Sequence, residues 1–76
     1  MTHRELVAEI NQVLEPIDLK FEKVRPEGTQ SVMLLSRGPR FDDNRSDSDL
    51  VTLIRKRLDE KPQVAEAVKD LAISLT

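Results

Sequence analysis

The segment from 37 to 45 contains the residue types that most often anchor protein interfaces. Three arginines and one phenylalanine fall within these nine residues. Guanidinium groups bind carboxylates and phosphates through several N–H donors, and aromatic rings contribute buried contact area. A further arginine falls within the apolar stripe of a predicted helix, where it either extends its stem over the core or meets a partner's carboxylate or phosphate. The predicted partner-binding residues are Arg37, Arg40, Phe41, Arg45 and Arg57.

Two other interpretations of this segment are open. Asp42 and Asp43 could neutralise the arginines locally, and Phe41 could cover the core as a lid. The aspartates also suggest a calcium loop, but the spacing, central glycine and terminal glutamate of an EF-hand are absent. Asp47 and Asp49 are explained more simply as acidic residues at the positive start of a helix. We therefore predict no metal site.

The chain lacks the residue combinations on which most catalytic sites depend. It has one histidine, His3, no cysteine and only two glycines. A Cys–His or Ser–His pair with an orienting group, a thiolate metal site and a glycine-rich phosphate loop are therefore not indicated. We predict that the protein is not an enzyme, with no catalytic residue and no cofactor.

Length and composition limit the class of protein further. The 76 residues predict one domain, spanning 1–76. No run approaches the roughly 18 apolar residues of a membrane span, and the N-terminal residues lack the apolar core of a signal peptide. With no cysteine, these features predict a cytoplasmic protein without membrane contact. The two aromatic residues are too few for a nucleic-acid stacking platform, and the net charge of −2 argues against general phosphate binding.

A β-hairpin from Ile17 to Leu35 is predicted at the centre of the fold. Residues 17–22 alternate between apolar and charged side chains, which is the period of a strand with one buried face. Pro26 and Gly28 indicate a turn, and residues 31–36 follow as the second strand. Because an isolated hairpin is marginal in water, other elements must cover it.

The second predicted strand has two apolar faces. Met33 and Leu35 lie on one face, and Val32 and Leu34 lie on the other. Either the protein's own helices cover both faces, or one face or edge meets another chain. A homodimer that joins two hairpins into one four-stranded sheet is the alternative, since exposed strand edges pair readily. With Ile73, which falls on the polar side of the last predicted helix, the candidate self-association residues are Met33, Leu35 and Ile73.

Three helices are predicted around the hairpin. Thr2 and Glu5 have the capping-box pattern at the start of the first helix, and Pro16 ends it. The second is predicted over 47–60, and the third begins at Pro62 and continues to the last residue. The predicted fold is an α+β domain of order α-β-β-α-α, with an antiparallel β-hairpin packed against helices.

Two classes of function are consistent with these features. The first is a small non-catalytic protein-interaction module, meaning a regulator, adaptor or inhibitor that docks on a larger protein, as many phage and plasmid accessory proteins do. The second is a nucleic-acid-binding protein that uses the basic segment from Arg37 to Arg57, where six basic residues face four acidic ones.

The order helix–strand–turn–strand also resembles the second half of a winged-helix domain. In that arrangement the first helix would enter the DNA groove, but it carries Glu5, Glu9 and Glu15, which a phosphate backbone repels. We therefore favour the protein-interaction module, with a protein partner.

Overall fold

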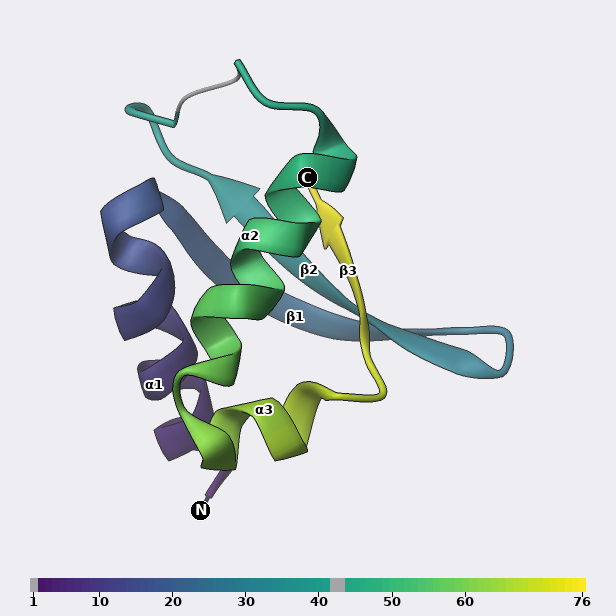
Figure 1. The fold of residues 1–76 in the computed structure, drawn as a ribbon. Coiled ribbons are helices and arrows are strands. Elements are labelled where there is room, and N and C mark those ends of the chain that lie inside the picture. The colour runs from purple at the N-terminus through teal and green to yellow at the C-terminus, as the bar shows by residue number, and fades with distance from the viewer. Residues whose placement is uncertain (1, 42–43) are drawn as a thin grey trace.

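The structure, a computed structural model, describes residues 2–41 and 44–76. Three helices and a three-stranded sheet form a small α+β fold (Figure 1). The elements in chain order are α1 (His3–Leu14), the short 3₁₀ helix η1 (Glu15–Ile17), β1 (Leu19–Glu27), β2 (Gln30–Arg37), α2 (Asp47–Asp59), α3 (Pro62–Val68) and β3 (Ala72–Leu75).

The helix starts predicted from the sequence are confirmed. At α1, the Thr2 hydroxyl accepts a hydrogen bond of 3.2 Å from the Glu5 N–H, and the Glu5 carboxylate accepts one of 3.4 Å from the Thr2 N–H. At α2, the Ser46 hydroxyl accepts a bond of 3.2 Å from the Asp49 N–H. These bonds satisfy backbone donors that the first turn of a helix leaves unpaired.

The hairpin is present, although both strands are longer than predicted, and the first begins later than predicted while the second begins one residue earlier, at Gln30. Ile17 belongs to η1, and β1 starts at Leu19. The antiparallel register extends from Leu19 opposite Arg37 to Glu27 opposite Gln30, with a bulge between Phe21 and Lys23. Gly28 supplies the positive φ of 64° that the tight turn requires.

The prediction of a last helix that continues to Thr76 was wrong. α3 ends at Val68, and residues 72–75 form β3, which pairs in parallel with β2. The spacing of Leu71, Ile73 and Leu75 fits a strand, while Leu71 and Leu75 also fit the apolar stripe of the predicted helix and Ile73 lies outside that stripe. The free edge of β2 favours the strand, because pairing with β3 satisfies backbone N–H and C=O groups of β2 that the hairpin leaves open.

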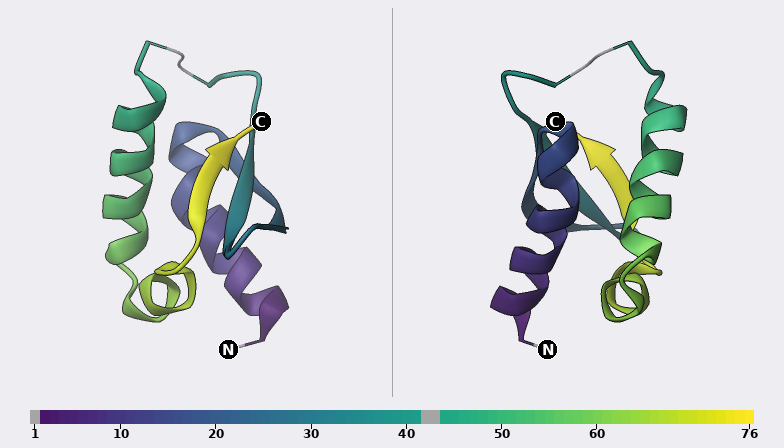
Figure 2. Two further views of the ribbon diagram at one scale, coloured as in Figure 1. Left: turned by 90° about the vertical axis from the view of Figure 1, so that its right-hand side faces the viewer. Right: turned by 60° about the vertical axis from the view of Figure 1, so that its left-hand side comes forward.

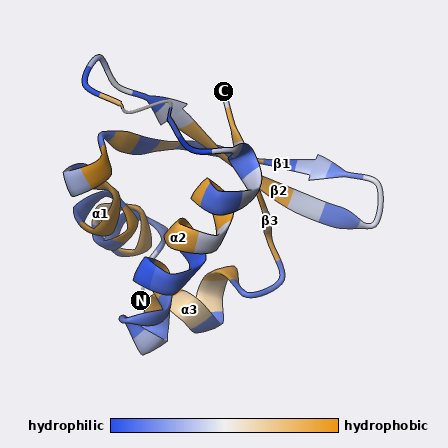
Figure 3. Cartoon of the chain, turned by 45° about the horizontal axis from the view of Figure 1, so that its top comes forward, coloured by the Kyte–Doolittle hydropathy of each residue, from blue (hydrophilic) through white to orange (hydrophobic). Residues whose placement is uncertain are grey.

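The hydrophobic core lies between the helices and one face of the sheet (Figures 1 and 2). Apolar segments occur in all three helices and in the strands that they cover (Figure 3). Met33 and Leu35 are completely buried in this core, and Ile73 packs against it. The buried residues of this core are Ile10, Leu14, Leu19, Met33, Leu35, Ile54, Leu58, Val64 and Val68.

β2 lies in the middle of the sheet and carries buried apolar residues on both faces. The strand order is β1-β2-β3, so both edges of β2 are occupied within one chain. Leu34 points away from Met33 and Leu35 and is still only 5% exposed. Its register partners are Lys23 on β1 and Ser74 on β3. A dimer that joins two hairpins through β2 is therefore not available to this fold, because β3 fills that place.

Candidate functional site

The left-handed residue Asp18 connects the end of η1 to the segment after β2. Its φ is 57°, a conformation that aspartate tolerates better than most residues. Its backbone carbonyl accepts a hydrogen bond of 2.8 Å from the Gly38 N–H. Its carboxylate accepts one of 2.5 Å from the Arg40 N–H. Asp18 therefore positions the backbone that carries Arg40 and Phe41.

Gly38 leaves room for this carboxylate close to the backbone. A Cβ at position 38 would collide with the side-chain atoms of Asp18. The carboxylate would then have to rotate and lose its bond to the Arg40 N–H. Gly38 thus permits the contact through which the loop is held.

A hollow of about 230 Å³ lies where η1, the 38–46 loop and α2 meet. Three of its lining residues are arginines and the other five are apolar. We call it the arginine hollow, and it is lined by Pro16, Ile17, Arg40, Phe41, Arg45, Leu50, Leu53 and Arg57. The structure thus brings four of the five predicted partner-binding residues to one place.

The fifth predicted residue, Arg37, contacts the same surface from its edge. Its guanidinium lies 5.5 Å from the centroid of the Phe41 ring, within the range of a cation–π contact. It also lies 3.7 Å from the carboxylate of Asp47, whose side chain is 83% exposed, so this ion pair contributes little to stability. Phe41 is half-buried and packs against the core, which leaves part of its ring accessible beside the arginines.

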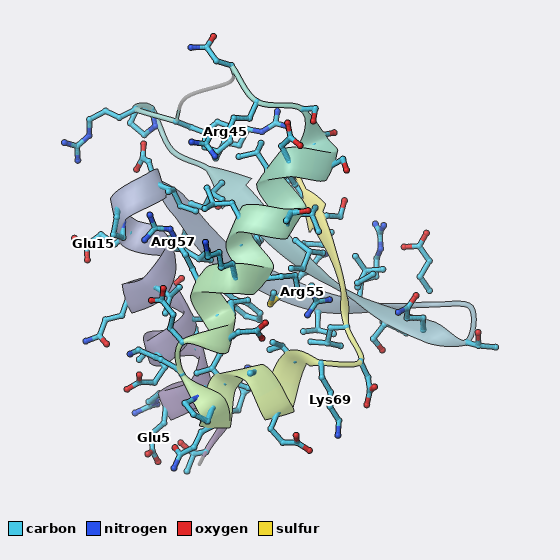
Figure 4. The ribbon with its side chains drawn as sticks, in the orientation of Figure 1. Glu5, Glu15, Arg45, Arg55, Arg57 and Lys69 are labelled. Carbon is cyan, nitrogen blue, oxygen red and sulfur yellow. The ribbon has the colours of Figure 1, made fainter. Side chains whose placement is uncertain are left out.

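Arg57 projects from α2 toward the end of α1 at which Glu15 lies (Figure 4). Its side chain is half-buried, and its Nε is fully buried without a hydrogen-bond partner among residues 2–41 and 44–76. Buried N–H donors are normally paired, so an unpaired guanidinium nitrogen calls for an acceptor from outside the described part of the chain.

Arg55, two residues earlier, is positioned differently. It lies on the opposite side of α2 (Figure 4), where it donates to the carbonyl of Val68 at 2.9 Å and to that of Leu71. These bonds join α2 to the end of α3 and to the turn before β3. Arg55 is thus used within the fold, and the two neighbouring arginines have separate roles.

The arginines of the hollow carry little compensating charge in the described structure. Across residues 2–41 and 44–76, Arg40, Arg45 and Arg57 form no ion pair. Among the described residues, none that lines the hollow is acidic. The interpretation in which Asp42 and Asp43 neutralise the arginines falls on residues outside the described ranges.

Sequence reasoning missed the residues that shape the site without carrying its charge. The alternation over residues 17–22 places Asp18 on the exposed face of a strand, and Leu50 and Leu53 fall in the apolar stripe of the second predicted helix, which indicates only a core position. The sequence does indicate a turn at Asp18, because aspartate tolerates the left-handed conformation and Pro16 lies two residues before it. The contact between Asp18 and position 40 spans 22 residues and has no local signature.

Other parts of the surface offer less. The described residues contain no group of three or more His, Cys, Asp or Glu side chains placed to hold a metal ion. A wider hollow of about 740 Å³ lies between α1 and α3, but its Lys61 already bonds to Glu9, and to Gln12 at 2.9 Å. His3 makes an edge-on ring contact with Phe21, with centroids 6.3 Å apart. Among the described helices, none has the length and apolar character to cross a membrane.

The fold and its site therefore define a small α+β domain with an arginine-rich hollow. Comparison with protein families found no matching family. The searches of curated proteins and of solved structures gave no significant match either.

Proposed function

We propose that this protein is a small non-catalytic interaction module, a regulator, adaptor or inhibitor that docks on a larger protein. Its docking surface consists of the arginine hollow together with Arg37. The proposal places the protein in the cytoplasm, for which the absence of cysteine is supporting evidence.

The convergence of the predicted residues carries this proposal. Residues from η1, the 38–46 loop and α2 meet around one hollow that combines cationic and apolar side chains. Arginine and aromatic side chains are enriched in interface hot spots because they combine contact area with directional hydrogen bonds. Asp18 holds the backbone at Gly38 and Arg40, which lowers the entropy cost of binding at these residues.

Site-specific photo-crosslinking in cells of the source organism tests the proposal. A photoreactive residue at the exposed position of Arg40 should give a discrete crosslinked protein. The same residue at Val24, which is 41% exposed on β1, serves as the matched control and should give none. The Arg40 product should disappear when Arg45 and Arg57 are both changed to Met. A product that persists in that variant would contradict the proposal.

Nucleic-acid binding through the segment from Arg37 to Arg57 is the second candidate. The three arginines of the hollow favour it, because guanidinium groups also bind phosphates. It predicts an affinity for duplex DNA that falls steeply as salt rises, with a slope set by the number of phosphates contacted. An affinity for duplex DNA that stays constant as the salt concentration rises would exclude nucleic-acid binding as the function.

Self-association through an edge of the sheet is the remaining part of the proposal. The edge strand β1 carries charged residues, Pro26 and a bulge, all of which oppose pairing with another strand. β3 has none of these, and its sequence, Ala-Ile-Ser-Leu, is uncharged. The edge that best supports a homodimer is therefore β3 rather than the hairpin.

A further inference from the structure

We infer that the arginine hollow binds the carboxylate of an acidic side chain flanked by apolar residues, presented by a partner protein. This inference rests on the proposed function and specifies its partner. The chemistry follows from three properties of the hollow, which are its unpaired donor, its apolar lining and its size.

The unpaired donor is the Nε of Arg57. A guanidinium can present its Nε and one terminal nitrogen side by side, in a geometry that matches the two oxygens of a carboxylate. This Nε is buried and unbonded within the described structure, so a carboxylate bonds to it once the guanidinium turns toward the hollow, and no existing hydrogen bond of the Nε is lost. Arg40 and Arg45 add positive charge to the same lining.

The apolar lining selects what flanks the carboxylate. Five of the eight lining residues are apolar, and Leu50 among them is only 3% exposed. Apolar residues on either side of the acid would cover Ile17, Leu53 and the accessible part of the Phe41 ring. Removing this surface from water adds affinity in proportion to its area.

The size favours one side chain over a free metabolite. The volume of about 230 Å³ lies below the roughly 300–1,000 Å³ of ordinary small-molecule sites.

The surrounding charge favours a carboxylate over a nucleic-acid backbone. Asp47 is paired with Arg37 at the edge of the surface, and Asp49 lies beside Arg45 in an adjoining hollow. A chain of phosphates crossing this surface would pass exposed carboxylates, whereas one acidic side chain need only enter the hollow.

Two labelled peptides that differ at one position test the inference. The first is Gly-Ser-Leu-Glu-Leu-Ser-Gly, and the second has Gln in place of Glu. Titration of the full-length protein is followed by ¹⁵N NMR at the Nε–Hε signal of Arg57, which the spectrum of Arg57→Lys identifies. We expect the Glu peptide to shift this signal and to bind at least about tenfold more tightly than the Gln peptide, as a charge-assisted bidentate contact implies.

Variants separate charge from geometry. Arg57→Met keeps the apolar stem and should abolish the difference in affinity between the two peptides. Arg57→Lys keeps the charge but not the paired N–H donors, so most of that difference should be lost. Lys56→Met removes the same charge from an exposed neighbour on α2 and should leave both affinities within twofold. A well-dispersed amide spectrum shows that a variant is folded. If Arg57→Met does not fold, the comparison is made with Arg57→Lys alone.

The outcomes distinguish the inference from the proposed function. Equal binding of the two peptides, or no shift at Arg57 with either, would overturn the inference, while a discrete Arg40 crosslink that is lost when Arg45 and Arg57 are changed to Met would still support protein docking. A shift at Arg57 caused by a short DNA duplex and not by the Glu peptide would overturn it in favour of phosphate. Peptide discrimination without any Arg40 crosslink in cells would leave the inference standing and contradict the proposed function.

Discussion

The side-chain oxygen of Asn11 accepts a hydrogen bond of 2.8 Å from the backbone N–H of Phe21. Because this N–H is not used in pairing with β2, the bond attaches α1 to the outer edge of β1. It satisfies a donor of an edge strand that would otherwise be open to another strand. One side chain thus both docks a helix and protects an edge.

Removal of this acceptor should weaken the fold. We expect Asn11→Ala to lower the free energy of unfolding by about 1–2 kcal/mol, because the part-buried N–H of Phe21 loses its partner. Asn11→Asp keeps an acceptor oxygen and is the matched control, with a loss of less than about 1 kcal/mol. Urea denaturation followed by circular dichroism measures both. Equal stability of Asn11→Ala and the wild type would show that water replaces the side chain.

The core position of Leu35 leads to an expectation opposite to that drawn from the sequence. If Leu35 lay in a dimer interface, Leu35→Lys would give a folded monomer. Since Leu35 is 0% exposed and packs among the helices, we expect Leu35→Lys to unfold the protein at 25 °C. An unpaired buried charge costs several kcal/mol, which is comparable to the whole stability of a small domain.

A charge at an exposed position of the same sheet provides the comparison. Val24 is 41% exposed and lies opposite Met33 in register, so Val24→Lys should remain folded. Dispersion of amide signals in a ¹⁵N NMR spectrum reports the folded state of each variant. A well-dispersed spectrum for Leu35→Lys would mean that this residue is accessible in solution.

The local rules of sequence were sufficient for most elements of the fold. Thr2 and Glu5, Ser46 and Asp49, and Pro62 all mark helix starts through contacts within one turn. The last segment could not be predicted in this way, because Leu71 and Leu75 fit a helix as well as a strand, and only Ile73, on the polar side of that helix, favours the strand. Its conformation depends on β2, about 40 residues earlier, whose open edge no local pattern reveals.

Asp18 should matter more for the site than its place in the sequence suggests. Asp18→Ala removes the acceptor for the Arg40 N–H and puts alanine in a left-handed conformation, which costs about 1–2 kcal/mol. We expect the free energy of unfolding to fall by roughly that amount and the Arg40 amide signal to move. Asp18→Asn, which keeps an acceptor and tolerates the same φ, should change both properties little.

Gly38→Ala tests the same contact from its other side. The new Cβ displaces the Asp18 carboxylate, so the Arg40 amide should move as it does in Asp18→Ala. Gly38 does not have a positive φ, so its backbone tolerates alanine without strain. An unchanged Arg40 amide would show that the carboxylate has room to rotate and still hold the loop.

The charged part of the candidate site was predictable from the sequence and its shape was not. Arg37, Arg40, Phe41 and Arg45 stand out because their types are dense in a short segment. Their grouping with Arg57 and with Ile17 depends on how η1, the loop and α2 pack together. The core determines how these segments pack, and this packing cannot be predicted from the spacing of residues in the sequence.

The uncharged edge of β3 leads to the last prediction, a homodimer that dissociates when a charge is added to this strand. Two copies that pair through β3 would form one continuous sheet, and the exposed Ser74 would lie at the junction. Sedimentation at increasing concentration should show wild-type dimer, whereas Ser74→Lys should stay monomeric because lysines from the two copies repel each other. Lys20→Ser, a change of charge on the opposite edge strand, should leave the dimer intact. A wild-type protein that is monomeric at every concentration would contradict self-association, and a dimer unaffected by Ser74→Lys would place it elsewhere on the surface.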